Sequence, residues 1–171
     1  MGYTLDVTGD ELNKIINTSY HVPIEDVNDN AFTTGARQSI TASSEYAYEN
    51  NGLLYSYSNF PSHITKLWNT TTNKLEFGEQ LNAPVYVANL QINFDPTASS
   101  TGVMTIRAYA DDGVDTLLQT VLVPFKAVDS RLNAIFTVYL DTLVKTNGVK
   151  FTYESSLDGE IYNRSGLFYR T

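Results

Sequence analysis

Few residues of the chain have the type and spacing needed for acid–base or nucleophilic chemistry. The two histidines, His21 and His63, belong to no H-x-x-x-H or H-x-H pair, and no G-x-S-x-G segment presents a nucleophilic serine. Cysteine is absent, which excludes thiol nucleophiles, thiolate metal sites and disulfides. The glycine-rich phosphate loops are missing as well. A Ser-His-Asp triad built from distant residues stays open, but the sequence predicts a protein that is not an enzyme and holds no cofactor.

Two acidic segments could offer oxygen ligands to a metal ion: residues 25–30, and the group Asp111, Asp112 and Asp115. An EF-hand loop needs glycine at its sixth position and glutamate at its twelfth, and neither segment has this pattern. Asp112 is followed by Gly113, a pair that favours a turn between two strands. We therefore expect a turn here and no bound metal.

Three N-x-[ST] sequons begin at Asn17, Asn69 and Asn163, and they could accept a glycan only in a secreted protein. The chain opens with MGYTLDVTGDEL, which lacks the basic and apolar regions of a secretory signal. The sequence contains no apolar run of about 18 residues, the length that a membrane-spanning helix needs. We therefore expect folding in a cytoplasm, no membrane insertion and no role for the sequons.

The charge of the chain limits its partners. It carries 11 Lys and Arg against 19 Asp and Glu, a net charge of −8 in 171 residues. Surfaces that bind nucleic acid or adsorb to anionic membranes need clustered basic residues, and this chain has no run of them. Neither nucleic acid nor membrane is therefore an expected partner.

Aromatic residues gather in the segment EYAYENNGLLYSYSNF, where Tyr46 and Tyr48 are two apart, as are Tyr55 and Tyr57. Residues two apart on a strand share one face. Such rings could form a stacking platform for a glycan or a partner protein. They could equally pack across strands inside a sandwich or between subunits, and packing is the favoured interpretation.

The start of the chain has the one segment with a helical pattern. Leu12, Ile15 and Ile16 recur at the spacing of a single helix face, behind two candidate capping residues. A helix of roughly eight residues is marginal alone in water, so its apolar face must pack against something. Residues 1–37 are therefore predicted to form a short helix and an extended arm that anchor the protein. The anchoring residues would be the apolar ones, Leu5, Val7, Leu12, Ile15 and Ile16.

From about residue 38 onward, apolar and polar residues alternate with the period of two that marks half-buried strands. One face of each expected strand is apolar. These faces are Tyr86, Ala88, Leu90, Ile92 and Phe94; Met104, Ile106 and Ala108; Leu117, Val121, Val123 and Phe125; Leu132, Ala134, Phe136, Val138 and Leu140; and Val149, Phe151 and Tyr153. Pro124 indicates an edge or a strand end, because proline cannot donate to a ladder.

Turn signals such as Asn147-Gly148 separate these strands. The segment LWNTTTNKLEF has the form of a hairpin in which Trp68 and Leu75 pack and the threonines face water. About eight to ten short strands at this spacing are typical of a β-sandwich or jelly roll. Residues 38–171 are therefore predicted to form an all-β domain, an antiparallel β-sandwich of the jelly-roll type.

The order of these segments resembles jelly-roll proteins on the virion surface of tailed bacteriophages, of the head decoration (cement) and fibre families. There a W-x-x-x-x-N-K hairpin precedes the core strands, and a D-T-(L/F)-V-x-x-N-G segment and a terminal R-T follow. The matching residues here are Trp68, Asn73, Lys74, Asp141 to Val144, Asn147, Gly148, Arg170 and Thr171. The match covers residues 55–171, with a weaker match in TGDELNKII. It implies a homotrimer with a tumour-necrosis-factor-like jelly roll.

The resemblance implies a structural component of a bacteriophage virion, assembled in the host cytoplasm. We expect a homotrimeric capsid decoration or short head-fibre protein, attached through residues 1–37 to the major capsid protein or another virion protein. An alternative is a tail-fibre tip or receptor-binding protein whose Tyr46, Tyr48, Tyr55 and Tyr57 contact host surface glycan. A hydrolase on a jelly-roll scaffold is a third alternative, which turnover of host polysaccharide would reveal.

Overall fold

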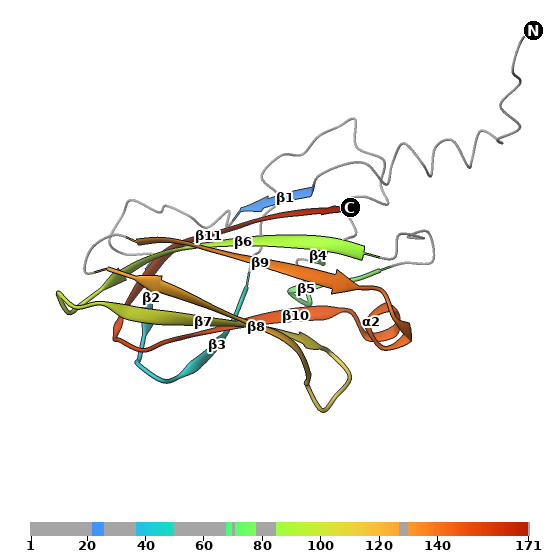
Figure 1. Ribbon diagram of the computed structural model, residues 1–171, viewed down its shortest axis with the longest axis horizontal. Coiled ribbons are helices and arrows are strands. Elements are labelled where there is room, and N and C mark those ends of the chain that lie inside the picture. Colours follow the sequence, from blue (N-terminus) through green and yellow to red (C-terminus); the bar gives the residue numbers. More distant parts are fainter. Residues whose placement is uncertain are drawn as a thin grey trace, which may run out of the picture.

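Two antiparallel sheets face each other in a sandwich (Figure 1). The computed structural model describes residues 22–25, 37–49, 68–69, 71–77, 85–126 and 130–170. Within these ranges nearly all regular structure is strand, which confirms the predicted all-β class and the sandwich. The predicted N-terminal helix lies outside the described residues.

The first sheet has the order β1-β11-β6-β9, and β2 also pairs with β11. Its members are β1 (Val22–Glu25), β2 (Gln38–Ile40), β6 (Val85–Pro96), β9 (Ser130–Tyr139) and β11 (Gly159–Arg170). β1 belongs to the segment expected to form an arm, and it pairs antiparallel with β11, Val22 opposite Phe168. This part of the segment therefore adds a strand to the sheet.

The second sheet has the order β4-β5-β10-β7-β8, and β3 also pairs with β10. Its members are β3 (Glu45–Ala47), β4 (Trp68–Asn69), β5 (Lys74–Leu75), β7 (Gly102–Ala110), β8 (Thr116–Phe125) and β10 (Val149–Ser155). The chain changes sheets between β2 and β3, β5 and β6, β6 and β7, β8 and β9, β9 and β10, and β10 and β11. β8 and β9 also contact each other. β8 and β9, the edge strands of their sheets, therefore lie on the same side of the sandwich.

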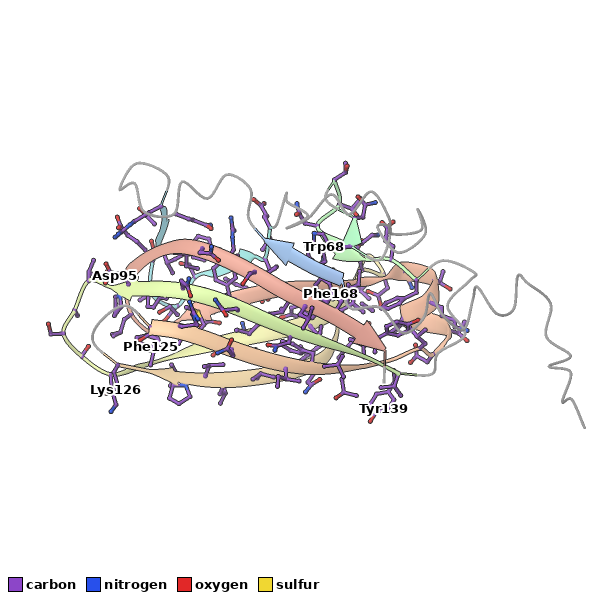
Figure 2. All side chains as sticks on the ribbon, turned by 90° about the horizontal axis from the view of Figure 1, so that it is seen from above. Trp68, Asp95, Phe125, Lys126, Tyr139 and Phe168 are labelled. Carbon is purple, nitrogen blue, oxygen red and sulfur yellow. The ribbon has the colours of Figure 1, made fainter. Side chains whose placement is uncertain are left out.

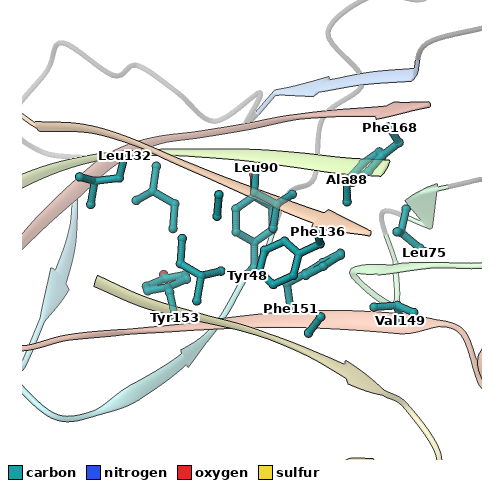
Figure 3. Close-up of a cluster of buried hydrophobic side chains, with 14 of the residues drawn as sticks. Tyr48, Leu75, Ala88, Leu90, Leu132, Phe136, Val149, Phe151, Tyr153 and Phe168 are labelled. Carbon is teal, nitrogen blue, oxygen red and sulfur yellow. The ribbon is translucent and has the colours of Figure 1, made fainter. Parts of the chain in front are cut away.

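The inner sides of the two sheets meet in one apolar core (Figure 3). The inward faces predicted for β6, β7, β9 and β10 are all buried, except that Leu140, just after β9, is only half-buried. Phe136 of one sheet and Phe151 of the other bring their ring centroids to 5.2 Å. Contacts of this kind, repeated along the strands, hold the two sheets together.

The prediction for Leu117 on β8 is wrong. Leu117 is 53% exposed, while Phe125 at the far end of the strand is buried as predicted. The register shifts between Ala108 and Tyr109 of β7, which pair with Gln119 and Leu117 respectively. One additional residue of β8 stands at this bulge, so the alternation reverses and Leu117 faces outward.

The predicted hairpin is confirmed, with β4 pairing antiparallel to β5. Its arms pack as expected: Trp68 and Leu75 are each 1% exposed. The Trp68 ring stacks on Phe168 of the facing sheet at 5.4 Å, and Figure 2 shows the two side by side. At the tip, the Asn69 Oδ1 accepts from the backbone N–H of Thr71 at 2.9 Å, which closes the turn.

Sequence reasoning missed the helix α2 (Thr142–Asn147), which connects β9 to β10. Its two ends carry recognisable signals. The Asp141 carboxylate accepts from the backbone N–H of Val144 at 2.8 Å, and Gly148 ends the helix with φ of 80°. The Asn147-Gly148 pair therefore closes a helix instead of forming a hairpin turn.

We expect Gly148→Ala to destabilise the protein more than Gly113→Ala. Both glycines have a positive φ, 80° and 84°, and Gly148 combines it with a ψ of −176°, a backbone region that is essentially restricted to glycine. A Cβ at Gly148 would also collide with the carbonyl oxygen of Leu75, whereas nothing lies within 4 Å of one at Gly113. We expect a total loss of about 2–4 kcal/mol for Gly148→Ala in urea denaturation. Equal losses would contradict this assignment.

Candidate interaction surfaces

The sequence predicted nine residues as anchoring or contact sites, and the structure describes two of them. The five anchoring residues, Leu5, Val7, Leu12, Ile15 and Ile16, lie outside the described residues, and so do Tyr55 and Tyr57. Tyr46 and Tyr48 are described, on β3 and directly after it.

Tyr46 and Tyr48 both direct their rings to the inner side of the sandwich. Tyr48 is completely buried, lies edge-on to Trp68 at 6.0 Å, and donates its hydroxyl to the Ser165 carbonyl at 2.6 Å. Tyr46 stacks on Tyr153 at 6.0 Å. The packing interpretation fits this placement, and the ring of Tyr48 is not open to a ligand in this structure.

Tyr153, on which the Tyr46 ring stacks, is the centre of a polar network. Its hydroxyl donates to Gln38 Oε1 at 2.7 Å, and Arg164 donates to the same oxygen at 3.0 Å. Burial raises the pKa of Tyr153 to about 12, from an ordinary value of 10.0. The folded protein therefore holds this proton more tightly than the unfolded chain does.

The stability that Tyr153 contributes should be complete below pH 10 and should be lost as the pH rises through 12. We expect the wild type to lose about 1 kcal/mol at this residue between pH 8 and pH 11. Tyr153→Phe should be less stable by about 1 kcal/mol at pH 8 and should lose less on going to pH 11. Urea denaturation at the two pH values measures this. Tyr139→Phe, at a tyrosine that is 67% exposed, is the control and should match the wild type.

The edge strands β8 and β9, together with the part of β6 that lies beside β9, carry very little charge. β8 and β9 are each 10 residues long and contain one charged residue between them, Arg131. Over the whole chain 18% of residues are charged, so this depletion is local. We call this region the charge-poor surface. Its exposed or half-buried members are Asn89, Gln91, Leu117, Leu118, Leu122, Asn133, Ile135, Thr137 and Tyr139.

Large apolar side chains project from the charge-poor surface along the β8–β9 side. Leu122 is 64% exposed, Ile135 57% and Tyr139 67%. The side chain of Gln119 on β8 accepts a hydrogen bond from the backbone N–H of Thr137 on β9 at 3.2 Å, which joins the two edge strands. Leu122 pairs with Thr105 and faces the outer side of the second sheet, whereas Ile135 and Tyr139 face the outer side of the first. The apolar side chains therefore stand on both faces of the β8–β9 border.

Asn89 lies on the outer side of β6, between Ile135 of β9 and Leu167 of β11 in the strand register. Its Oδ1 atom is buried and finds no hydrogen-bond donor within the part of the chain that the structure describes. Protein interfaces are depleted in charge at their centres and bury apolar and amide side chains. The charge-poor surface is therefore suited to contact another protein.

A second surface, of opposite character, lies on the outer side of the second sheet. β3 and β5 pair with the same edge of β10, one after the other along it, and a hollow of about 460 Å³ opens where they meet. We call it the β10 concavity. Its principal lining residues are Glu45, Glu49, Asn73, Tyr109, Asp115 and Lys150.

One side of the β10 concavity is organised by Glu45. The hydroxyl of Tyr109 donates to the Glu45 carboxylate at 3.1 Å, Thr152 donates to the same oxygen, and Arg107 lies 3.3 Å from it. Burial alone would raise the pKa of Glu45, but these hydrogen bonds and the Arg107 charge together hold the pKa below its ordinary value. Glu45 is therefore a fixed anionic acceptor.

The other side is organised by Lys150. Its ammonium lies 2.6 Å from Asp115 and 3.4 Å from Asp111, and Asp111 also accepts from Lys74 at 2.8 Å. The hydrogen bond from Lys74 is the main cause that lowers the pKa of Asp111, and the bond to Asp115 is the main cause that raises the pKa of Lys150. These contacts favour the charged forms of Asp111 and Lys150, and the four side chains hold one another in place.

Among the described residues, no three His, Cys, Asp or Glu side chains gather in a way that could hold a metal ion. Asp112, which the sequence placed in a turn, accepts from Thr116 and from the Val114 N–H at 3.2 Å. The Asp112 carboxylate therefore holds the β7–β8 loop together through these hydrogen bonds. In the same part of the chain, no helix has the length and apolar character to cross a membrane.

Comparisons with known proteins identify the fold. No model of a protein family matches the sequence, and no curated protein matches it either. Among solved structures, an Eiger TNF from S. frugiperda matches with a TM-score of 0.54 at 9% identity, over 90% of this chain and 94% of the other. The globular domain of zebrafish complement 1qA matches with a TM-score of 0.46 at 9% identity, over 88% and 98%. The sandwich is therefore a jelly roll of the tumour-necrosis-factor type.

Proposed function

We propose that this chain is a non-enzymatic structural protein that acts as a homotrimer on the surface of a bacteriophage virion, as a capsid decoration or short head-fibre protein. The observation that carries the association is the charge-poor surface. Exposed apolar patches of this kind mark protein contacts, and a second copy of the chain offers a surface of the same uncharged character.

The two parts of the charge-poor surface differ in shape, which favours a ring. The β8–β9 side is a projecting border, whereas the outer side of β6 is a sheet face rich in amides. A contact of the border of one copy with the face of the next is heterologous, and such contacts form a ring when the rotation from copy to copy closes. A three-membered ring agrees with the trimer that the sequence resemblance implies.

The virion location rests on that sequence resemblance. β1 pairs with β11 of its own sandwich, so we assign the proposed contact with the major capsid protein or another virion protein to the sequence that precedes β1. The apolar residues there, Leu12, Ile15 and Ile16 among them, are the proposed anchor. Attachment to an assembled shell would also stabilise the folded protein by mass action.

The mass of the purified protein in solution tests the trimer. Light scattering after size exclusion should give three copies of the 19.1-kDa chain at micromolar concentration. A monomer at that concentration would overturn the association.

Deletion of residues 1–21 tests the anchor, because it leaves β1 in place. Particles assembled with the shortened chain should lack it, although the shortened protein should still form trimers alone. A virion that carries the shortened protein at the normal level would overturn the anchoring role. Hundreds of copies per normal particle would favour a decoration protein, and a few dozen at most would favour a fibre.

A further inference from the structure

The β10 concavity has the size and the composition of a small-ligand site. Its volume of about 460 Å³ lies within the range of ligand pockets. Tyr109 on β7 supplies a ring, and its surroundings supply carboxylates, an amide and an ammonium group. These groups come from three separate parts of the fold: β3, the β4–β5 turn, and the β7–β8 loop with β10.

The polar groups of the concavity are held in place before any ligand arrives. Glu45 is fixed by Thr152, Tyr109 and Arg107, and Lys150 holds Asp115 at 2.6 Å. The three Glu45 contacts all go to one oxygen, Oε1, so the Oε2 atom is the one that would accept a hydrogen bond from a ligand. Groups that are already ordered lose little entropy on binding.

Backbone strain also gathers at this hollow. Three described residues other than glycine have a positive φ, namely Ser43 (60°), Asn73 (52°) and Asp115 (57°), and the last two line the concavity. Strained backbone is retained where the surrounding structure holds it, often at binding sites. Asn and Asp adopt this left-handed conformation readily in turns, so the case for a site rests on the cavity and its lining groups.

The charge balance selects the class of ligand. Glu45, Glu49 and Asp115 bring three carboxylates to the hollow, against the single ammonium of Lys150. An anionic ligand would meet net repulsion. Neutral hydroxyls can donate to the carboxylates and accept from the amide and the ammonium, and the apolar face of a sugar ring can lie against an aromatic side chain.

We propose that the β10 concavity binds a neutral pyranose unit of a saccharide, with Tyr109 as the stacking ring and Glu45, Asn73, Asp115 and Lys150 as hydrogen-bonding groups. The site lies on the second sheet, away from the β6 face of the charge-poor surface. The inference goes beyond the structural role and does not rest on the oligomeric state.

Isothermal titration calorimetry of the full chain with defined oligosaccharides tests this site. The probes are maltotriose and N,N′,N″-triacetylchitotriose, which are neutral, and trigalacturonate, which is anionic. We expect a neutral probe to bind with a dissociation constant in the millimolar range or tighter and trigalacturonate to bind at least about tenfold more weakly.

Two variants locate the binding, and a third controls for backbone strain. Tyr109→Leu removes the ring and keeps an apolar side chain on β7, and Asn73→Gly removes the amide at a position whose positive φ glycine accepts. Each should weaken binding about tenfold or more. Ser43→Gly relieves the same kind of strain outside the concavity and should bind as the wild type does. Circular dichroism checks that each variant is folded.

Loss of binding in Asn73→Gly with retention in Ser43→Gly would support the site even if Tyr109→Leu failed to fold. Three results would overturn it: no binding of either neutral probe at 10 mM, which is about the upper limit for a meaningful affinity; preference for trigalacturonate; or unchanged binding in Asn73→Gly.

Discussion

Ile135→Asp is expected to convert the proposed trimer into monomers. Ile135 is 57% exposed at the centre of β9, opposite Asn89 of β6, so it would lie in the middle of the association surface. Burying a carboxylate there without a partner costs about 2–3 kcal/mol or more at each interface, and a closed trimer has three of them. Light scattering should therefore show a monomer across the micromolar range.

The control for this variant is Val114→Asp. Val114 is 81% exposed, more than Ile135, but it stands in the loop before β8 and outside the charge-poor surface. It introduces the same charge into the same acidic chain, and it should leave the trimer intact. Dissociation in both variants would mean that added charge alone separates the subunits. If both variants remained trimeric, β9 would not be part of the interface.

Trp68→Ala is expected to lower the free energy of unfolding by about 3–5 kcal/mol. Trp68 is 1% exposed, stacks on Phe168 at 5.4 Å and meets Tyr48 edge-on at 6.0 Å. The first of these contacts crosses from one sheet to the other, so the truncation would leave a cavity between the sheets. Urea denaturation of the purified protein measures the loss.

Thr72→Ala is the matched control, because Thr72 belongs to the exposed tip of the same hairpin. Its hydroxyl donates only to the exposed side chain of Glu76, at 3.0 Å. The change should therefore stay within about 0.5 kcal/mol. A loss below about 1 kcal/mol in Trp68→Ala would show that the hairpin contributes little to the core.

Alternation of apolar and polar residues was sufficient to predict the inward faces of most strands. Phe136 and Tyr153 follow this rule because a strand with one buried side repeats every two residues. Leu117 breaks it, because the bulge opposite Ala108 and Tyr109 depends on how β7 and β8 pair. Because the bulge is a property of the β7–β8 pair, the alternation of residues within β8 alone could not predict it.

The β10 concavity could not be predicted from the sequence, because no segment contains it. Glu45, Asn73, Tyr109 and Lys150 are far apart in the chain, and only the successive pairing of β3 and β5 with β10 brings them together. The helix α2 is a different case, since Asp141 and Gly148 mark its ends in the sequence itself. The charge depletion of β8 and β9 is likewise visible once the strands are known.

The pairing of β6 with β11 sets the order of events during synthesis. Val87 of β6 pairs with Tyr169 of β11, so the first sheet cannot close until the ribosome has made both strands. At about 5–20 residues per second, β6 waits several seconds for its partner, and such non-local pairing is slow. β6 and β9 also supply the charge-poor surface. Both strands are made before β11, so a nascent chain exposes this surface before its first sheet is complete, and a crowded polysome would favour premature association between neighbouring chains.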